Sequence, residues 1–128
     1  MLLLDTHAFV WLVSDADRLS DRAKAAIRSN AGELYLAAIS GLEIGLLVKR
    51  GRLELPIVPE AFIERGMNHH GITEVPMTWR IAHASSQLPD IHNDPFDRII
   101  IATALNQGAT ILTMDRIIAQ YEGAATLW

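Results

Sequence analysis

Short apolar runs alternate along the chain with stretches in which apolar residues recur at helical spacing. The apolar runs Leu2–Asp5, Glu33–Ala38 and Thr110–Asp115 predict buried strands, and two of these runs end on an aspartate. The segment Ile72–Pro76 alternates in the manner of a strand, and Ala125–Trp128 predicts a last strand at the C-terminus. Strands separated by helices in this way predict a parallel sheet that is covered on both faces.

Helices are predicted between the strands, where apolar residues repeat every three or four positions and capping residues mark the ends. The predicted helical segments are Thr6–Val13, Leu19–Asn30, Ser40–Gly51, a helix from about Pro59, Thr78–Leu88, Asp94–Gln107 and a turn or two at Arg116–Tyr121. Ser20 is placed to cap the second helix, Gly51 is placed to end the third, and Gly108 is placed to end the helix Asp94–Gln107. The expected fold class is α/β, a three-layer α/β/α sandwich with a central parallel sheet.

The composition of the chain indicates how many domains it forms and which kinds of partner it can attract. Half of the 128 residues are hydrophobic, which suits one domain spanning residues 1–128. The net charge of −4 and the pI near 5.6 give no bulk electrostatic reason to bind nucleic acid. Any contact with nucleic acid must therefore be local, and nine of the eleven basic residues are Arg, which suits phosphate contacts.

The chain has no cysteine, which excludes disulfides, thiolate metal sites and cysteine nucleophiles. The N-terminal stretch "MLLLDTHAFVW" lacks a basic segment and is interrupted by Asp5, so it does not resemble a signal peptide. No apolar stretch approaches the roughly 20 residues that span a bilayer. We therefore expect a soluble, cytoplasmic protein without a membrane partner.

Acidic residues fall at related places on this predicted frame. Asp5 ends the first strand and Asp115 the fourth, while Glu43 and Asp97 lie in the first turns of helices. Open parallel sheets bind ligands at the carboxyl ends of their strands, and crossover connections are right-handed. The topology therefore predicts that the four carboxylates gather at one edge of one sheet.

Each acid also has an ordinary structural interpretation. Glu43 fits a capping box with Ser40, and Asp97 suits the positive end of a helix dipole. Asp5 and Asp115 are each placed to cap the segment that follows them. Helix starts attract acid for such reasons, so any one of these residues taken alone indicates little about function.

Taken together, the acids indicate a cation site. Crowded carboxylates repel one another and raise each other's pKa, and a hard cation with oxygen ligands such as Mg²⁺ or Mn²⁺ relieves this. An ion in such a site binds phosphate oxygens and activates a water for in-line attack on phosphorus. The acidic cluster therefore predicts a phosphate-containing substrate even in an acidic protein.

The two aspartates of "NDPFDRIII" receive different interpretations. Asp94 is the expected N-cap of the helix, with Pro95 in its first position, and Asp97 is assigned to the metal. No histidine pair shows the spacing of a zinc helix, which argues against a histidine metal site. His92, two residues before Asp94, is expected to order the loop by a hydrogen bond. The tryptophans are assigned to the core rather than to base stacking: Trp11, Trp79 and Trp128.

Four segments in order resemble the PIN domain, and in particular toxins of the VapC type. They are "LLLDTHAFVWL", "SGLEIGLLVKRGRLEL", "HNDPFDRIIIATAL" and "ILTMDRIIAQY". The likeness runs from Met1 to Trp128 at the spacing usual in the family, and all four of the family's acidic positions hold a carboxylate.

The resemblance implies a metal-dependent endoribonuclease with an α/β/α sandwich and an acidic quartet that holds Mg²⁺ or Mn²⁺. The quartet falls on Asp5, Glu43, Asp97 and Asp115, with Asp5 and Asp97 as the principal ligands. Thr113 falls where the family often has a Ser or Thr near the metal. Attack by a metal-activated water would leave a 5′-phosphate and a 3′-hydroxyl.

The resemblance also implies partners. Toxins of this type pair with a small antitoxin, form homodimers, and bind operator DNA as the toxin–antitoxin complex. The segment of residues 48–66, basic and then apolar, is the candidate contact for antitoxin or RNA. The alternative is a non-catalytic PIN-like module that binds a partner protein, and no residue pattern indicates which RNA would be cut.

Overall fold

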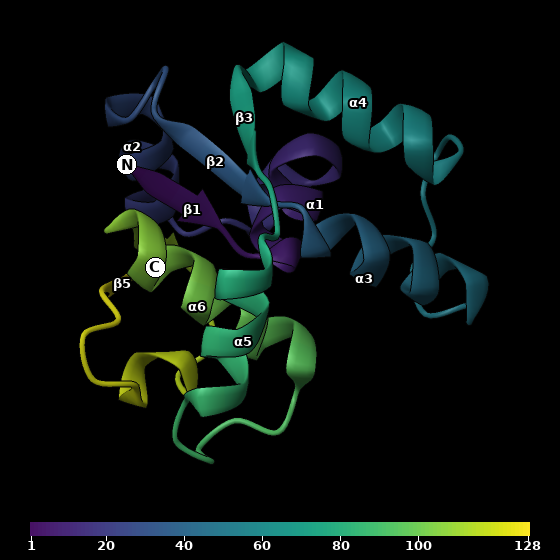
Figure 1. The fold of residues 1–128 in the computed structure, drawn as a ribbon. Coiled ribbons are helices and arrows are strands. Elements are labelled where there is room, and N and C mark those ends of the chain that lie inside the picture. Colours follow the sequence, from purple (N-terminus) through teal and green to yellow (C-terminus); the bar gives the residue numbers. More distant parts are fainter.

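A five-stranded parallel sheet forms the centre of the computed structural model, which describes residues 1–128 (Figure 1). The strand order is β3-β2-β1-β4-β5, and every neighbouring pair is parallel. The strands are β1 (Leu2–Leu4), β2 (Leu34–Ala37), β3 (Ile72–Val75), β4 (Thr110–Leu112) and β5 (Thr126–Leu127). The predicted α/β class with a central parallel sheet is confirmed.

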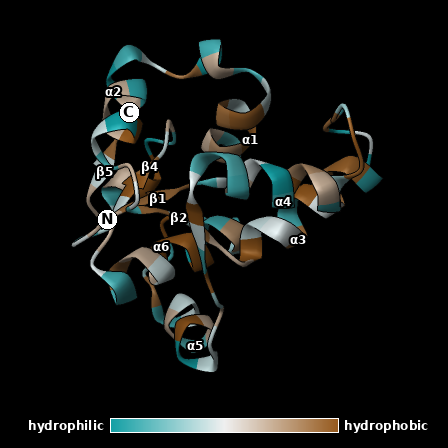
Figure 2. Ribbon diagram, turned by 90° about the horizontal axis from the view of Figure 1, so that it is seen from above, coloured by the Kyte–Doolittle hydropathy of each residue, from teal (hydrophilic) through white to brown (hydrophobic).

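Six α-helices cover the sheet in two layers (Figures 1 and 2). They are α1 (Thr6–Ser14), α2 (Asp21–Ser29), α3 (Ile39–Lys49), α4 (Pro59–His70), α5 (Trp79–Gln87) and α6 (Pro95–Gln107), with 3₁₀ turns η1 (Ala16–Arg18) and η2 (Ile118–Gln120). One hydrophobic cluster joins the sheet to α1, α2 and α4, and a second joins it to α6 and η2. None of the helices has both the length and the apolarity needed to cross a membrane.

The central strand β1 shows how the sheet divides the core. Leu2 and Leu4 belong to the cluster that contains Phe9 of α1, while Leu3 belongs to the cluster that contains Ile101 of α6. Successive side chains of a strand point to opposite faces, so an unbroken apolar run fits a strand covered on both sides. Figure 2 shows the hydrophobic residues on the strands and on the helix sides that face them.

The strand order creates a switch point beside β1. The chain runs outward from β1 through β2 to β3, and then returns to place β4 on the other side of β1. Leu4 pairs with Leu36 on one side and with Leu112 on the other. Ligands of open α/β sheets bind at such a point, at the carboxyl ends of the strands. Asp5 follows β1 directly, so it stands at this crevice.

Several predicted boundaries were wrong. Strand β1 stops before Asp5, because the Asp5 backbone carbonyl already accepts the first hydrogen bond of α1, from Phe9 N–H at 3.0 Å. Strand β4 ends at Leu112, so Asp115 lies beyond it, and the segment 116–121 forms only the 3₁₀ turn η2. Ser20 does cap α2, accepting from Ala23 N–H at 2.9 Å.

Two other expectations fail for tertiary reasons. Helix α3 begins at Ile39 without a side-chain cap, and the Ser40 hydroxyl hydrogen-bonds to Thr6 at 2.9 Å, so the capping box that was the alternative interpretation of Glu43 does not form. Trp79 is 69% exposed at the start of α5, where its ring packs under the guanidinium of Arg80, so its assignment to the core was wrong.

Candidate functional site

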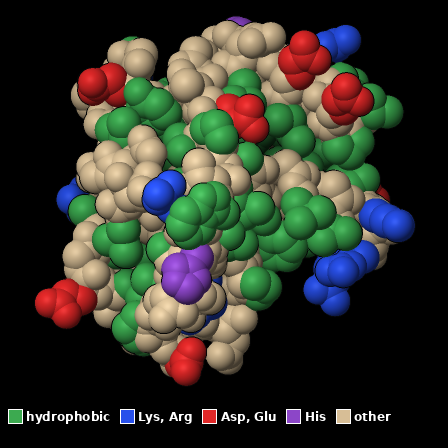
Figure 3. All heavy atoms as spheres, in the orientation of Figure 1, with side chains coloured by type: hydrophobic (Ala, Val, Ile, Leu, Met, Phe, Trp, Pro, Cys, Tyr) green, Lys and Arg blue, Asp and Glu red, His purple; other side chains and the backbone are tan.

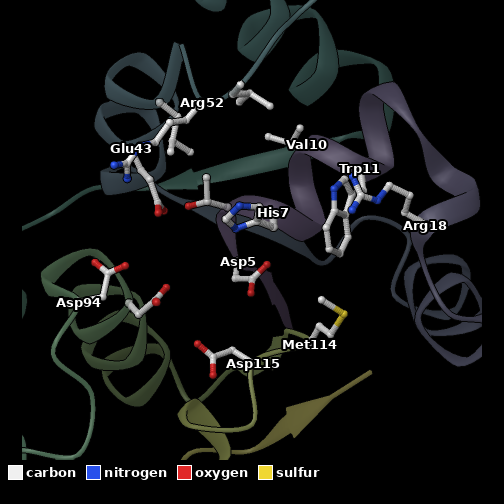
Figure 4. A pocket seen from close by; sticks show the side chains of 14 residues that line it. Asp5, His7, Val10, Trp11, Arg18, Glu43, Arg52, Asp94, Met114 and Asp115 are labelled. Carbon is white, nitrogen blue, oxygen red and sulfur yellow. The ribbon is translucent and has the colours of Figure 1, made fainter. Parts of the chain in front are cut away.

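All four predicted carboxylates line one pocket of about 590 Å³ at the carboxyl edge of the sheet. Figure 4 shows Asp5, Glu43 and Asp115 pointing into the same space, although they come from different elements. Asp94 lines the pocket as well, beside Asp97 at the start of α6. The structure brings the four acids together at one edge of the sheet, as the topology predicted.

Asp5 lies at the floor of the pocket. Its carboxylate is only 8% exposed, and its Oδ1 accepts from Ala8 N–H at 2.8 Å as the N-cap of α1. Burial raises the pKa of Asp5, against the opposing effect of the Thr113 hydroxyl and of the Ala8 N–H. The buried Thr113 Oγ1 also accepts from Asp115 N–H at 3.0 Å, so Thr113 connects two of the acids.

Glu43 projects from α3 with its carboxylate 8% exposed. Its Oε1 is buried and has no hydrogen-bond partner. Burial raises the pKa of Glu43, and the carboxylates of Asp94 and Asp5 raise it further. A buried oxygen without a partner is rare in folded proteins and calls for a ligand or an ion to satisfy it.

Asp94 and Asp97 stand one turn apart and have different roles. Asp94 Oδ1 accepts from Phe96 N–H at 2.9 Å, which confirms Asp94 as the N-cap of α6, with Pro95 in the first position. Asp97 faces the other acids, and burial together with the carboxylates of Asp94 and Glu43 raises its pKa to about 7. Such crowding costs free energy until a positive charge enters the pocket.

Asp115 is held from two sides. Its Oδ1 accepts from Ile117 N–H at 2.8 Å, and its Oδ2 lies 2.9 Å from His92 Nε2. The same Nε2 lies 3.0 Å from Asp97 Oδ2. Burial acts to raise the pKa of Asp115, but the hydrogen bonds from His92 and from Ile117 N–H outweigh it and hold the pKa below its usual value.

The loop that carries His92 is fastened by residues that sequence reasoning missed. Arg98 donates through its guanidinium to four backbone carbonyls, those of Ser85, Leu88, Pro89 and His92. Its donors are thus committed inside the protein, which removes Arg98 from the candidates for phosphate contact. The Tyr121 hydroxyl accepts from His92 N–H at 2.7 Å and donates to Pro89 O at 3.0 Å. No local signal points to Tyr121, which lies 29 residues away from His92.

The side of the pocket opposite Asp94 is aromatic and basic (Figure 4). Arg18 lies over the Trp11 ring, 4.5 Å from its centroid, and both residues line the pocket. Leu53 of the α3–α4 connection also lines the pocket, and so does Arg52, which lies beside Glu43 (Figure 4). Trp11 also packs edge-on against Trp128, with ring centroids 5.8 Å apart. The sequence assigned Trp11 to the core, but the residue is only partly buried against the core and also lines the pocket.

The donor set suits a hard divalent cation. The pKa values of Asp5, Glu43 and Asp97 are all raised, chiefly by burial, so the pocket holds more negative charge than it can stabilise alone. The oxygens of Asp97 and Asp115 lie within 4.8 Å of each other and of His92 Nε2. Carboxylate oxygens are the ligands that Mg²⁺ and Mn²⁺ take, and the free Oε1 of Glu43 is available to such an ion.

Comparisons with known proteins identify relatives of nearly the whole chain. The family model described as PIN domain matches residues 2–124. The sequence is 33% identical to Ribonuclease VapC22 of Mycobacterium tuberculosis over 130 residues, which covers 99% of this chain and 98% of that protein.

Solved structures show the same fold at low sequence identity. VapBC2 from Rickettsia felis, bound to a DNA fragment from its promoter, superposes with a TM-score of 0.73 at 12% identity, over 98% of this chain and 96% of the other. FitAcB from Neisseria gonorrhoeae superposes with a TM-score of 0.69 at 21% identity, over 100% and 97%. DNA-bound VapBC from Salmonella typhimurium superposes with a TM-score of 0.70 at 14% sequence identity, over 98% of this chain and 96% of the other.

Proposed function

Because the chain belongs to the PIN-domain family, which confirms the resemblance seen in its sequence, we propose that it is a metal-dependent endoribonuclease and the toxin of a toxin–antitoxin pair. The single domain of residues 1–128 would act as a whole. The observation that carries the proposal is the pocket lined by Asp5, Glu43, Asp97 and Asp115, in which the buried Glu43 Oε1 has no partner.

The four acids would hold Mg²⁺ or Mn²⁺, with Asp5 and Asp97 as principal ligands. The chemistry that such an ion supplies is neutralisation of charge at the phosphate and activation of a water for in-line attack. Asp5 and Asp115 are oriented by the N–H groups of Ala8 and Ile117, so their carboxylates are pre-positioned before substrate arrives. Thr113 supports both from below the site.

RNA is supported as the substrate by the basic and aromatic side of the pocket. Arg18 over Trp11 offers a flat cation on which an unstacked base can lie, and Arg52 offers a second cation for the phosphate backbone. Because the net charge is −4, these local arginines carry the attraction that bulk charge does not. A single strand that crosses from Trp11 to the acids would place a phosphodiester at the carboxylates.

A protein partner is supported by exposed apolar residues in the α3–α4 connection. Val58 is 68% exposed and Ile57 is 38% exposed in the α3–α4 connection, inside the segment 48–66 proposed for antitoxin or RNA contact. Operator DNA would be bound through the antitoxin, because the toxin itself is acidic. The relatives whose structures contain DNA are toxin–antitoxin complexes.

A second copy of the chain is the proposed partner of another face. Figure 3 shows hydrophobic side chains gathered where α3 and α5 come forward, with Lys and Arg side chains at the far end of α3. Leu42 of α3 is 53% exposed, and Trp79 of α5 is 69% exposed. Exposed apolar residues that gather on one face suit a protein interface. Trp79→Asp should convert a dimer into a monomer in light scattering, without loss of the helical circular dichroism signal.

The test of the activity is cleavage of a mixed RNA pool with Mg²⁺, with Mn²⁺ and with EDTA. We expect cleavage only with metal, products with a 5′-phosphate and a 3′-hydroxyl, and no cleavage by Asp97→Asn. Glu74→Gln, an exposed acid on β3 outside both the pocket and the segment 48–66, is the matched control that should cleave as wild type. Activity that persists in EDTA, or in Asp97→Asn, would contradict the proposed site.

The toxin role is tested separately, in cells. Induction of the wild-type chain should arrest growth, and induction of Asp97→Asn at equal protein level should not. Growth arrest by both variants would indicate a non-catalytic protein-binding module instead.

A further inference from the structure

We propose that His92 is a positioning residue of this site: its Nε2–H braces the carboxylates of Asp97 and Asp115 at the spacing a divalent cation requires. This inference rests on the proposed function, since it concerns the same acids. It differs from the expected role of His92, which was only to order its own loop. The loop bond is present, and the imidazole performs a second task with its other nitrogen.

The tautomer of His92 follows from its neighbours. Asp94 N–H donates to His92 Nδ1 at 3.1 Å, so Nδ1 presents a lone pair and the proton of the neutral ring is on Nε2. That nitrogen is the one that lies 2.9 Å from Asp115 Oδ2 and 3.0 Å from Asp97 Oδ2. The backbone of the helix start therefore determines which nitrogen donates toward the acids.

The same geometry argues against His92 as a metal ligand. Ligation through Nε2 needs a lone pair there, and the neutral ring would then carry its proton on Nδ1. That proton would face Asp94 N–H at 3.1 Å, two donors against each other. A donor nitrogen beside two carboxylates is the arrangement of a group that orients ligands from outside the metal's own coordination shell.

His92 can position the two acids only if it is itself held in place. Both its backbone N–H and its backbone carbonyl form hydrogen bonds. Its N–H donates to the Tyr121 hydroxyl at 2.7 Å, and its carbonyl accepts from Arg98 Nη1 at 3.3 Å. The His92 side chain is 12% exposed. The imidazole thus connects a loop held by hydrogen bonds to two acids, Asp97 of α6 and Asp115 in the segment after β4.

Two amide substitutions separate the two tasks of the ring. His92→Gln places an amide donor near the position of Nε2, so it keeps the contact to Asp115 and gives up the bond from Asp94 N–H. His92→Asn places an amide oxygen near Nδ1, so it keeps the bond from Asp94 N–H and gives up the brace. Each variant is compared with the wild type by calorimetric titration with Mn²⁺ alone, and by RNA cleavage.

We expect His92→Asn to bind Mn²⁺ about tenfold or more weakly, the range seen when outer partners of metal ligands are changed. We expect His92→Gln to stay within about threefold of wild type, far from the loss that removal of such a partner causes. Wild-type Mn²⁺ affinity in His92→Asn, or equal losses in both variants, would overturn the brace. Wild-type protein that binds no Mn²⁺ would instead overturn the proposed function.

A measurement on the unaltered, metal-free protein gives an independent readout. Nitrogen-15 spectra of the histidine rings distinguish the two neutral tautomers, and we expect His92 in the Nε2–H form. An Nδ1–H form would overturn the brace whether or not metal binds and whether or not the variants fold. Asp97 and Asp115 are left unchanged in this experiment, so its outcome does not depend on activity.

Discussion

The guanidinium of Arg98 and the hydroxyl of Tyr121 lie 3.3 Å apart, and both donate to the carbonyl of Pro89. Together they hold the loop between α5 and α6 in place. Arg98 belongs to the helix that also carries Asp97, and its side chain is 14% exposed. The basic residue next to Asp97 is therefore a structural anchor, because its guanidinium is occupied by backbone carbonyls.

Arg98→Lys should destabilise the fold although it keeps the charge. Lysine cannot reproduce the planar fork that donates to four carbonyls, and it leaves partly buried acceptors without these partners. We expect the free energy of unfolding to fall by about 2–3 kcal/mol, measured by urea denaturation. Arg22→Lys on the exposed face of α2 is the control and should change stability by less than about 0.5 kcal/mol. Equal stability of the two variants would contradict the anchoring role.

Stability of the metal-free protein should fall as pH rises toward neutrality. The pKa of Asp97 is raised to about 7 in the fold, so the folded state binds its proton more tightly than the unfolded chain, whose Asp has a pKa of about 4. The stability contributed by that proton is complete below about pH 4 and is lost as pH rises through about 7. The pKa values of Asp5 and Glu43 are also raised, so these residues likewise lower the stability of the fold as pH rises. The lowered pKa of Asp115 makes stability rise with pH instead, but this effect is confined to more acidic solution.

The measurement is urea denaturation in EDTA from about pH 5 to about pH 8, over which we expect a loss of about 1–3 kcal/mol. Asp97→Asn should flatten this dependence, because the titrating group is gone. Millimolar Mg²⁺ should restore stability at the alkaline end, where the carboxylates are charged and bind the ion. A metal-free stability that rises over this interval would show that the acids are not crowded as the structure has them.

Glu43→Gln should stabilise the metal-free protein and weaken metal binding at the same time. The change removes a buried carboxylate whose Oε1 has no partner, and at about pH 8 we expect a gain of about 1 kcal/mol in the free energy of unfolding. Mn²⁺ affinity should fall by at least the roughly tenfold seen when an outer partner is changed. Glu74→Gln should leave both quantities as they are. Unchanged Mn²⁺ affinity in Glu43→Gln would remove Glu43 from the ligand set.

Arg18→Gln should weaken RNA binding without altering the chemical step. The residue lies over Trp11 on the side of the pocket opposite Asp94, where it contacts none of the acids. We expect KM for a short single-stranded RNA to rise about fivefold or more, as loss of a stacking and phosphate contact predicts, with kcat unchanged. The dependence of affinity on salt should also become shallower. Arg28→Gln, on α2 outside the pocket, is the control; equal KM values for the two variants would exclude the Arg18 side from the RNA path.

The elements and the positions of the acids were readable from the sequence, because both depend on neighbours within a few residues. Apolar runs predicted the five strands, and capping chemistry predicted Ser20 and Asp94 at their helix starts. Right-handed crossovers then sufficed to bring Asp5 and Asp115 to one edge of the sheet.

The sequence alone also left the local interpretation of Glu43 open, and tertiary structure decided it. Ser40 bonds Thr6 across 34 residues of chain, so the capping box is lost and the Glu43 carboxylate turns into the pocket. His92 meets Asp115 across 23 residues.

By itself, then, the sequence determined the order of strands and helices, the helix starts and the edge of the sheet where the carboxylates stand. Tertiary structure alone decided which of their oxygens are already bonded, which imidazole nitrogen faces them, and what lies across the pocket. The physical reason is the range of the forces involved. Hydrophobic periodicity and capping act within one or two turns of chain, whereas a hydrogen bond between distant residues exists only after the core has packed and brought them within 3 Å or so of each other.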